Sequence, residues 1–274
     1  MLCAVVVQMM GGPATEIPFD YRDGLIWLKV RAEGASEPLD FLLDSGASVS
    51  VIDLGTANRL GLKLGSRVAV RGVQTETAGH WPQRLNASAS SVALPRDFLA
   101  LDLQKLSKAC ACRVDGLVGA DFFRDRVVQV DFAARIIRLL AVAPAKADES
   151  LPLEIQRDVL RVPVAVNGGK PQWMRLDTGC ASALQWVSSA RPATTTATRR
   201  RISVGLAEVP VAMASTTVTL GKLRFDEVPT GVHGKQIFAG EAGLLGNGLL
   251  SQFIVTVDAP NKRLLLVKFP AASR

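Results

Sequence analysis

The sequence predicts a mostly β protein made of two homologous halves, and three observations indicate this. Short stretches rich in Val, Leu and Ile are separated by Gly and Pro, which is typical of many short strands. Aromatic residues make up only 5% of the 274 residues, so aliphatic side chains must form most of the core. The chain also contains a weak internal duplication whose period is far longer than that of a solenoid repeat.

The duplication consists of three segments that recur in the same order at nearly constant spacing. The pairs are residues 43–47 (LDSGA) with 176–180 (LDTGC), 17–19 (IPF) with 151–153 (LPL), and 116–119 (GLVG) with 243–246 (GLLG). We therefore expect one lobe over residues 15–143 and a second over 151–270. The Ala- and Pro-containing polar segment between them, residues 143–150, is expected to be a linker.

Each half is expected to show the same order of elements. A strand (residues 24–30 or 158–166), a turn and a second strand (39–43 or 172–176) lead to the repeated Asp-Ser/Thr-Gly motif. Asn167-Gly168 is a strong hairpin signal. In the first half, Asp53 is expected to cap a short helix that runs to Leu60 and ends at Gly61. Each half should close with a pair of strands, at residues 127–131 with 135–140 and at 253–258 with 263–268.

Charge and composition exclude several classes of function. The net charge of +7 indicates a basic protein with scattered Lys and Arg, because its one basic run, Arg199–Arg201, is too short and lacks the aromatics of a nucleic-acid surface. Cys110 and Cys112 are too close for a usual zinc site, and the only histidines are His80 and His233. The sequence has no nucleophile elbow, phosphate-binding loop, dinucleotide fingerprint or zinc-protease motif. We therefore expect no metal, no cofactor and no nucleic-acid partner.

The N-terminus does not decide the compartment. Its apolar run within residues 1–14 has no Lys or Arg, so it is read either as the remnant of an export signal or as a first strand. No later run approaches the ~20 apolar residues of a membrane span. An exported or periplasmic location and a cytoplasmic one both stay open.

The repeated motifs resemble those of aspartic peptidases of the pepsin and retropepsin superfamily. The resemblance rests on residues 42–48 (LLDSGAS), residues 175–181 (RLDTGCA) and the two Gly-Leu-Val/Leu-Gly segments. It implies a two-lobed single chain in which each lobe is a closed six-stranded barrel with short helices. It also implies that Asp44 and Asp177 form the catalytic pair at the bottom of a cleft between the lobes.

The resemblance assigns roles to further residues. Ser45 and Thr178 would hydrogen-bond across the lobe interface, while Gly46 and Gly179 suit the tight backbone beside them. Gly119 and Gly246 are candidates for close backbone approach behind the motifs, in the psi loop, although a glycine in an ordinary turn is an equal alternative. The flap candidates, in an expected hairpin over residues 68–81, are Gly72, Gly79 and Trp81. A second hairpin, over residues 198–211, would bring Arg199–Arg201 to the mouth of the cleft.

A pair of carboxyl groups is suited to peptide-bond hydrolysis, because one can act as the acid and the other as the base. Two carboxyl groups that share one water cannot both ionise cheaply, so they hold one proton between them. The ionised group accepts a proton from the attacking water and the protonated group donates to the peptide carbonyl oxygen. Pepsin-like enzymes usually carry Ser or Thr three residues after each Asp, where this chain has Ala47 and Cys180. Cys180 is expected to pack as a small apolar residue.

These observations favour an aspartic endopeptidase that cuts an extended peptide or protein substrate. The alternative is a catalytically silent peptide-binding or structural protein with the same fold, which the altered third positions and the unusual flap keep open. Two complete motifs in one chain make a retropepsin-like homodimer unnecessary, so we expect a monomer. The sequence does not reveal the substrate, its side-chain preference or the pH optimum.

Overall fold

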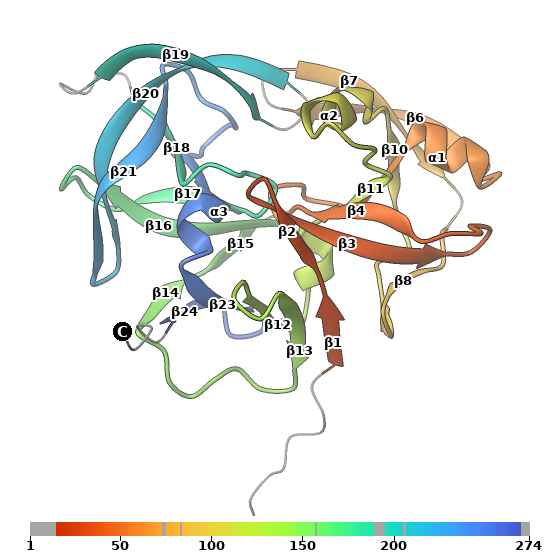
Figure 1. Ribbon diagram of the computed structural model, residues 1–274, viewed down its shortest axis with the longest axis horizontal. Coiled ribbons are helices and arrows are strands. Elements are labelled where there is room, and N and C mark those ends of the chain that lie inside the picture. The colour runs from red at the N-terminus through yellow and green to blue at the C-terminus, as the bar shows by residue number, and fades with distance from the viewer. Residues whose placement is uncertain are drawn as a thin grey trace, which may run out of the picture.

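The structure is a computed structural model that describes residues 15–72, 75–82, 84–156, 158–188, 195–204 and 207–269. The strands form three sheets, and the few helices are short (Figure 1), so the predicted mostly β class is confirmed. The N-terminal apolar run at residues 1–14 lies outside the described residues. In the described part of the chain, no helix is both long and apolar enough to cross a membrane.

The largest sheet takes all its strands from the first half of the chain. In order across the sheet they are β6 (Leu64–Gly72), β7 (Thr75–Pro82), β10 (Leu99–Leu101), β5 (Val51–Asp53), β11 (Gly116–Val118), β4 (Leu39–Leu43), β3 (Leu25–Ala32), β8 (Ala87–Ala89) and β9 (Val92–Ala93), with β2 (Asp20–Arg22) also paired to β3. The predicted strand at residues 39–43 is β4. Its neighbour in the middle of the sheet, β11, runs parallel to it.

The second sheet takes its strands from the second half. Their order is β15 (Glu154–Gln156), β16 (Val159–Val166), β17 (Gln172–Asp177), β22 (Gly243–Gly246), β18 (Leu184–Val187), β21 (Leu223–His233), β20 (Ala207–Leu220) and β19 (Thr195–Val204). β16 also pairs with β20, so the strands from β16 to β20 in this order form a closed ring of pairings. The described strands of the first sheet show no such ring, and two closed barrels stay a prediction.

A third sheet joins the two halves at the bottom of Figure 1. Its order is β1 (Thr15–Pro18), β13 (Ile136–Leu140), β12 (Val127–Asp131), β23 (Phe253–Asp258), β24 (Arg263–Lys268) and β14 (Glu149–Pro152). The two predicted closing pairs of strands are confirmed. β13 begins one residue later than predicted, because Arg135 lies in the turn with φ +56°. The central pairing of β12 with β23 connects strands from opposite halves.

The predicted linker at residues 143–150 is wrong at its end. Glu149 and Ser150 belong to β14, where they pair with Leu266 and Leu265 of β24. The sequence suggested a linker because this segment is polar. Edge strand β14 is satisfied by main-chain hydrogen bonds and does not require an apolar sequence.

The predicted helix after Asp53 is confirmed as α1 (Leu54–Arg59). The Asp53 side chain accepts a hydrogen bond from Thr56 N, and Gly61 has φ +67°, which ends the helix. The other helices are α2 (Gln104–Ala109), the 3-10 helix η1 (Ala120–Phe123) and α3 (Asn247–Leu250). η1 and α3 directly follow the two Gly-Leu-Val/Leu-Gly segments, so the duplication extends to these short helices.

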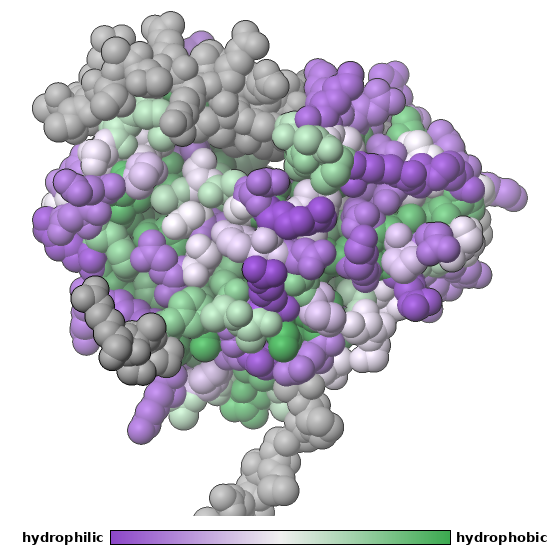
Figure 2. All heavy atoms as spheres, viewed as in Figure 1, coloured by the Kyte–Doolittle hydropathy of each residue, from purple (hydrophilic) through white to green (hydrophobic). Residues whose placement is uncertain are grey.

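The largest apolar cluster contains buried residues from both halves. Phe41 and Leu43 of β4 belong to it, as do Leu176 of β17 and the strand residues Val128 and Val255 of the joining sheet. On the face shown in Figure 2, apolar and polar residues are interspersed. The continuous core supports the segments that follow β4 and β17, which carry the repeated motifs.

Candidate active site

The first motif follows β4 and is held by β11. Asp44 N donates to Val118 O (2.8 Å), which continues the parallel pairing of the two strands. Beyond the motif, Ala120 N donates to Ala47 O (2.7 Å). The turn of residues 44–47 is therefore fastened at both ends to the segment 118–120.

The second motif is built in the same way from β17 and β22. Asp177 pairs with Gly246 at the end of the parallel pairing, and Asn247 N donates to Cys180 O (2.8 Å). Because both halves use the same arrangement of strands, each aspartate leaves its strand at an equivalent point.

Four reciprocal hydrogen bonds join the two motifs. Ser45 Oγ donates to Leu176 O (2.8 Å) and accepts from Thr178 N (3.0 Å). Thr178 Oγ1 donates to Leu43 O (2.9 Å) and accepts from Ser45 N (2.9 Å). Both hydroxyl side chains are buried, so each one satisfies a backbone donor and a backbone acceptor of the opposite half.

Each carboxyl group lies against the glycine of the opposite motif. A Cβ atom built on Gly46 would lie 2.5 Å from Cγ of Asp177, and one built on Gly179 would come closer still to Oδ1 of Asp44. No side chain fits at either position without displacing a carboxyl group. Asp44 and Asp177, which are far apart in sequence, thus lie close enough to affect each other's protonation.

Backbone amides hold both carboxyl groups in place. Asp44 Oδ1 accepts hydrogen bonds from Gly46 N (3.0 Å) and Ala47 N (3.1 Å), and Asp177 Oδ1 accepts one from Gly179 N (2.9 Å). Burial raises the pKa of Asp44 above its usual range. Burial also raises the pKa of Asp177, and the negative charge of Asp44 raises it further. The arrangement favours a pair that keeps one proton at a pH where isolated carboxyl groups have lost theirs.

An ion pair that was not predicted lies beside the two motifs. Arg175 Nε and Nη2 donate to Glu241 Oε2 (2.8 Å) and Oε1 (2.6 Å), and both side chains are buried. Arg175 Nη1 donates to Gly46 O (2.7 Å) in the other motif. The available sequence signal was a charged residue between the apolar residues Met174 and Leu176, just before Asp177.

Asn247 is a second residue near the site that was not predicted. Its Nδ2 donates to Thr178 O (2.7 Å) and to Gly24 O (2.8 Å), so it ties α3 to the second motif and to the turn between β2 and β3. In the sequence, Asn247 could have been found as a residue of the site because it directly follows the repeated segment 243–246.

The two glycines proposed for close backbone approach lie in crowded places. A Cβ on Gly119 would lie 2.5 Å from the carbonyl carbon and oxygen of Val49, and one on Gly246 would overlap Ser182 O. Neither position has room for a side chain beside the motif it supports. The roles assigned to the site residues from sequence stay predictions.

The flap candidates lie on an antiparallel hairpin formed by β6 and β7. In its register Val68 faces Gly79 and Gly72 faces Thr75, and residues 73–74 between the strands are outside the described residues. A Cβ on Gly79 would meet Cδ2 of Leu101 at 2.7 Å, so this glycine permits close packing on β10. Trp81 is 39% exposed. The function of this hairpin as a flap stays a prediction.

The second predicted hairpin is formed by β19 and β20. Arg199–Arg201 lie on β19, and Arg200 faces Val211 across the hairpin. The position of these arginines at the mouth of a cleft stays a prediction. Within the described residues, no group of three or more His, Cys, Asp or Glu is placed to hold a metal ion.

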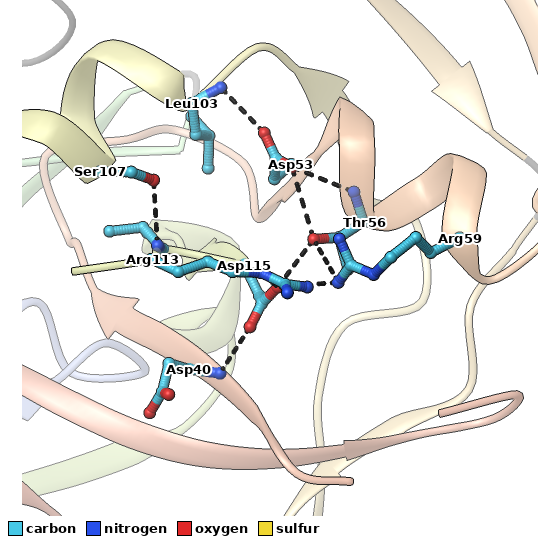
Figure 3. A network of polar contacts seen from close by, with 9 residues as sticks. Asp40, Asp53, Thr56, Arg59, Leu103, Ser107, Arg113 and Asp115 are labelled. Carbon is cyan, nitrogen blue, oxygen red and sulfur yellow. Dashed lines mark hydrogen bonds and ion pairs between the residues drawn. The ribbon is translucent and has the colours of Figure 1, made fainter. Parts of the chain in front are cut away.

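A polar network around Asp115 lies at the start of β4, the strand that precedes the first motif (Figure 3). Asp115 Oδ1 accepts hydrogen bonds from Thr56 Oγ1 (2.7 Å), Arg59 Nη2 (3.1 Å) and Arg113 Nε (2.7 Å). Asp115 Oδ2 accepts one from Asp40 N (3.1 Å), and Asp115 N donates to Asp40 O (2.8 Å). The network ties α1 and the start of β11 to the start of β4, the strand that delivers Asp44.

Comparison with known proteins bears on the first half. A family model described as aspartyl protease matches residues 28–122, which include the first motif and the segment 116–119 that supports it. No curated protein matches the chain. Over residues 28–122 the chain is similar to the aspartyl protease family, which supports a peptidase as its class.

Proposed function

We propose that this chain is an aspartic endopeptidase in which a water molecule is activated between Asp44 and Asp177. The observation that carries the proposal is the reciprocal contact between the motifs. Each carboxyl group lies against the glycine of the other motif, and Ser45 and Thr178 bond across the same junction. Two carboxyl groups in such contact, that of Asp177 buried and that of Asp44 half-buried, suit a reaction that needs one acid and one base.

The proposed reaction uses one shared proton. The ionised carboxylate removes a proton from water while the water oxygen attacks the peptide carbonyl carbon, and the protonated carboxyl donates to the carbonyl oxygen. The C–N bond of the tetrahedral intermediate then breaks. The carboxyl group that took the proton from water gives it to the leaving nitrogen, and the other carboxylate takes a proton from a hydroxyl group of the intermediate, which restores the shared proton. The raised pKa of each aspartate supports this scheme, because the acid must keep its proton until the carbonyl takes it.

We also propose the two-lobed organisation expected from the duplication, with lobes at residues 15–143 and 151–270 in one monomeric chain. The separate sheets of the two halves support this division. An extended peptide would bind as an added strand, held by main-chain hydrogen bonds. The β6–β7 hairpin, with Gly72, Gly79 and Trp81, is the proposed flap over it.

Cleavage of a random peptide library across a range of pH tests the proposal. We expect the unmodified protein to cut, and the Asp44→Asn and Asp177→Asn variants to lose at least about 10³-fold in kcat/KM. Asp97→Asn is a matched control, because Asp97 forms an exposed ion pair with Arg84 and its side chain is 68% exposed. Cleavage that survives Asp44→Asn would refute the mechanism.

A peptide that contains a statine hydroxyl provides a second test, because this group mimics the tetrahedral intermediate. We expect it to inhibit cleavage and to bind the protein. If the protein binds peptides and cuts none at any pH, the catalytically silent peptide-binding protein replaces the enzyme as the explanation.

A further inference from the structure

We propose that Arg175, held by Glu241, is a positioning residue that makes the two halves of the site unequal. It anchors the first motif from the second half and places a positive charge beside the aspartate pair. This inference rests on the proposed function for its importance to catalysis. Its effect on the two aspartates can be measured without any substrate.

The first half has uncharged residues at the positions equivalent to Arg175 and Glu241. In the strand pairings, Arg175 faces Leu244 as Leu42 faces Leu117. The repeat that aligns Gly243 with Gly116 places Val114 where the second half has Glu241. The strand pairings and the sequence repeat therefore make Leu42 the equivalent of Arg175, and Val114 the equivalent of Glu241.

Leu42 and Val114 are buried in one apolar cluster. The same arrangement of strands is therefore stable with an apolar pair at this position. A buried ion pair is costly to desolvate and is often replaceable by apolar residues without loss of stability. A role beyond stabilising the fold explains best why the second half has Arg and Glu here.

The guanidinium group of Arg175 has a fixed orientation. Glu241 accepts two of its N–H groups, and the plane lies over the ring of Phe238 with Cζ 3.6 Å from the ring centroid. The group that remains, Nη1, donates to Gly46 O. A rigid donor from the second half thus fixes a carbonyl group of the first motif.

A change at Arg175 would reach both aspartates through Gly46. Its amide donates to Asp44 Oδ1, and the space that a Cβ on Gly46 would take is filled by the carboxyl group of Asp177. A shift of Gly46 would therefore move one aspartate and release space beside the other. Displacements of about 1 Å in a catalytic group can reduce rates by about 100-fold.

The charge of Arg175 also acts on the pair, where it lowers the pKa of both Asp44 and Asp177 against the effect of burial. Cys180 is a further titratable group close to the pair, and burial raises its own pKa so that the thiol stays neutral. Glu241 partly cancels the charge of Arg175. Loss of Arg175 and loss of Glu241 should therefore shift the pair in opposite directions.

Carbon-13 NMR of the aspartate carboxyl groups measures these shifts, with signals assigned from Asp44→Asn and Asp177→Asn. We expect Arg175→Leu to raise the apparent pKa values of the pair by about one unit, and Glu241→Gln to lower them by up to about the same amount. The double variant Arg175→Leu/Glu241→Val copies the apolar pair of the first half and should fold even if Arg175→Leu does not. Its pKa values should exceed those of the unmodified protein and stay below those of Arg175→Leu.

Arg175→Lys separates position from charge. Lysine keeps the positive charge but cannot bind Glu241 through two N–H groups while it also donates to Gly46 O. We expect the pKa values to stay within about half a unit and kcat/KM to fall at least tenfold with KM little changed.

Two results would overturn the inference: single variants of Arg175 and Glu241 that shift the pair in the same direction or not at all, or an Arg175→Lys variant with full activity. If the unmodified protein cuts no peptide while the opposite NMR shifts are seen, the proposed function fails and the electrostatic role of Arg175 stands.

Discussion

The hydrogen bonds between Ser45 and Thr178 make a quantitative prediction about how the two motifs are held together. The perturbation is Ser45→Ala, which removes one hydroxyl group from a site that is 1% exposed. The change leaves Leu176 O without its donor and Thr178 N without its acceptor. Both groups stay buried at the junction of the two halves.

The magnitude follows from these two unsatisfied groups. Each buried polar group without a partner costs about 1–3 kcal/mol, so the two groups together should lower the free energy of unfolding of Ser45→Ala by about 2–6 kcal/mol. Thr178→Val keeps the side-chain volume and leaves Leu43 O and Ser45 N unsatisfied, so we expect a similar loss. The double variant should lose less than the sum, by about 1 kcal/mol, because water can enter once the motifs separate.

Urea unfolding followed by tryptophan fluorescence measures these losses. Thr216→Val is a matched control, because its buried hydroxyl bonds to that of Thr230 (2.7 Å), which keeps a second partner in Val228 O. The control should lose about 1 kcal/mol and keep its activity. A loss from Ser45→Ala no larger than that of the control, or full additivity in the double variant, would refute the reasoning.

Three further predictions concern the same site. Since the pKa of Asp177 is higher in the folded protein than the ~3.9 of an unfolded chain, the folded state binds more protons between these values and stability falls as pH rises. Asp177→Asn should therefore stabilise the protein by an amount that grows from pH 4 to pH 8 in thermal unfolding, and a gap that is constant over this range contradicts the prediction. Gly179→Ala should displace the carboxyl group of Asp44 and reduce kcat/KM about 100-fold with the far-ultraviolet circular dichroism unchanged, while activity within twofold of the unmodified protein counts against it. Cys180 is buried, and burial raises its pKa, so it should resist iodoacetamide at pH 8 in the folded protein and react in urea. Peptide mass mapping measures this labelling, and rapid labelling of the folded protein would contradict the prediction.

Most local elements near the site could be predicted from the sequence. Residues 39–43 form β4 as expected, and α1 begins after Asp53 and ends before Gly61. These features depend on apolar patterning, caps and turns, which involve residues close together in the chain. The same local reasoning failed at Glu149 and Ser150, because an edge strand is formed by hydrogen bonds to a distant partner.

Contacts at the site between distant residues could be predicted only in part. The hydroxyl groups of Ser45 and Thr178 were assigned their cross-interface bonds by resemblance to a family, since nothing near either residue indicates the other. No resemblance indicated Arg175 and Glu241. A charge within an apolar strand is normally read as a solvent-facing residue, and its buried partner lies 66 residues away.

The sequence by itself determined that the chain carries two equivalent Asp-Ser/Thr-Gly turns, each placed after a buried strand. Repeats, strands and turns are encoded by neighbouring residues, and a reader of the sequence can compare one half with the other. Only the tertiary structure decided that the halves meet through β12 and β23, and that Arg175 reaches Gly46 from the opposite motif. Such contacts arise when the chain closes on itself, and the geometry of that closure is set by the packing of the whole core.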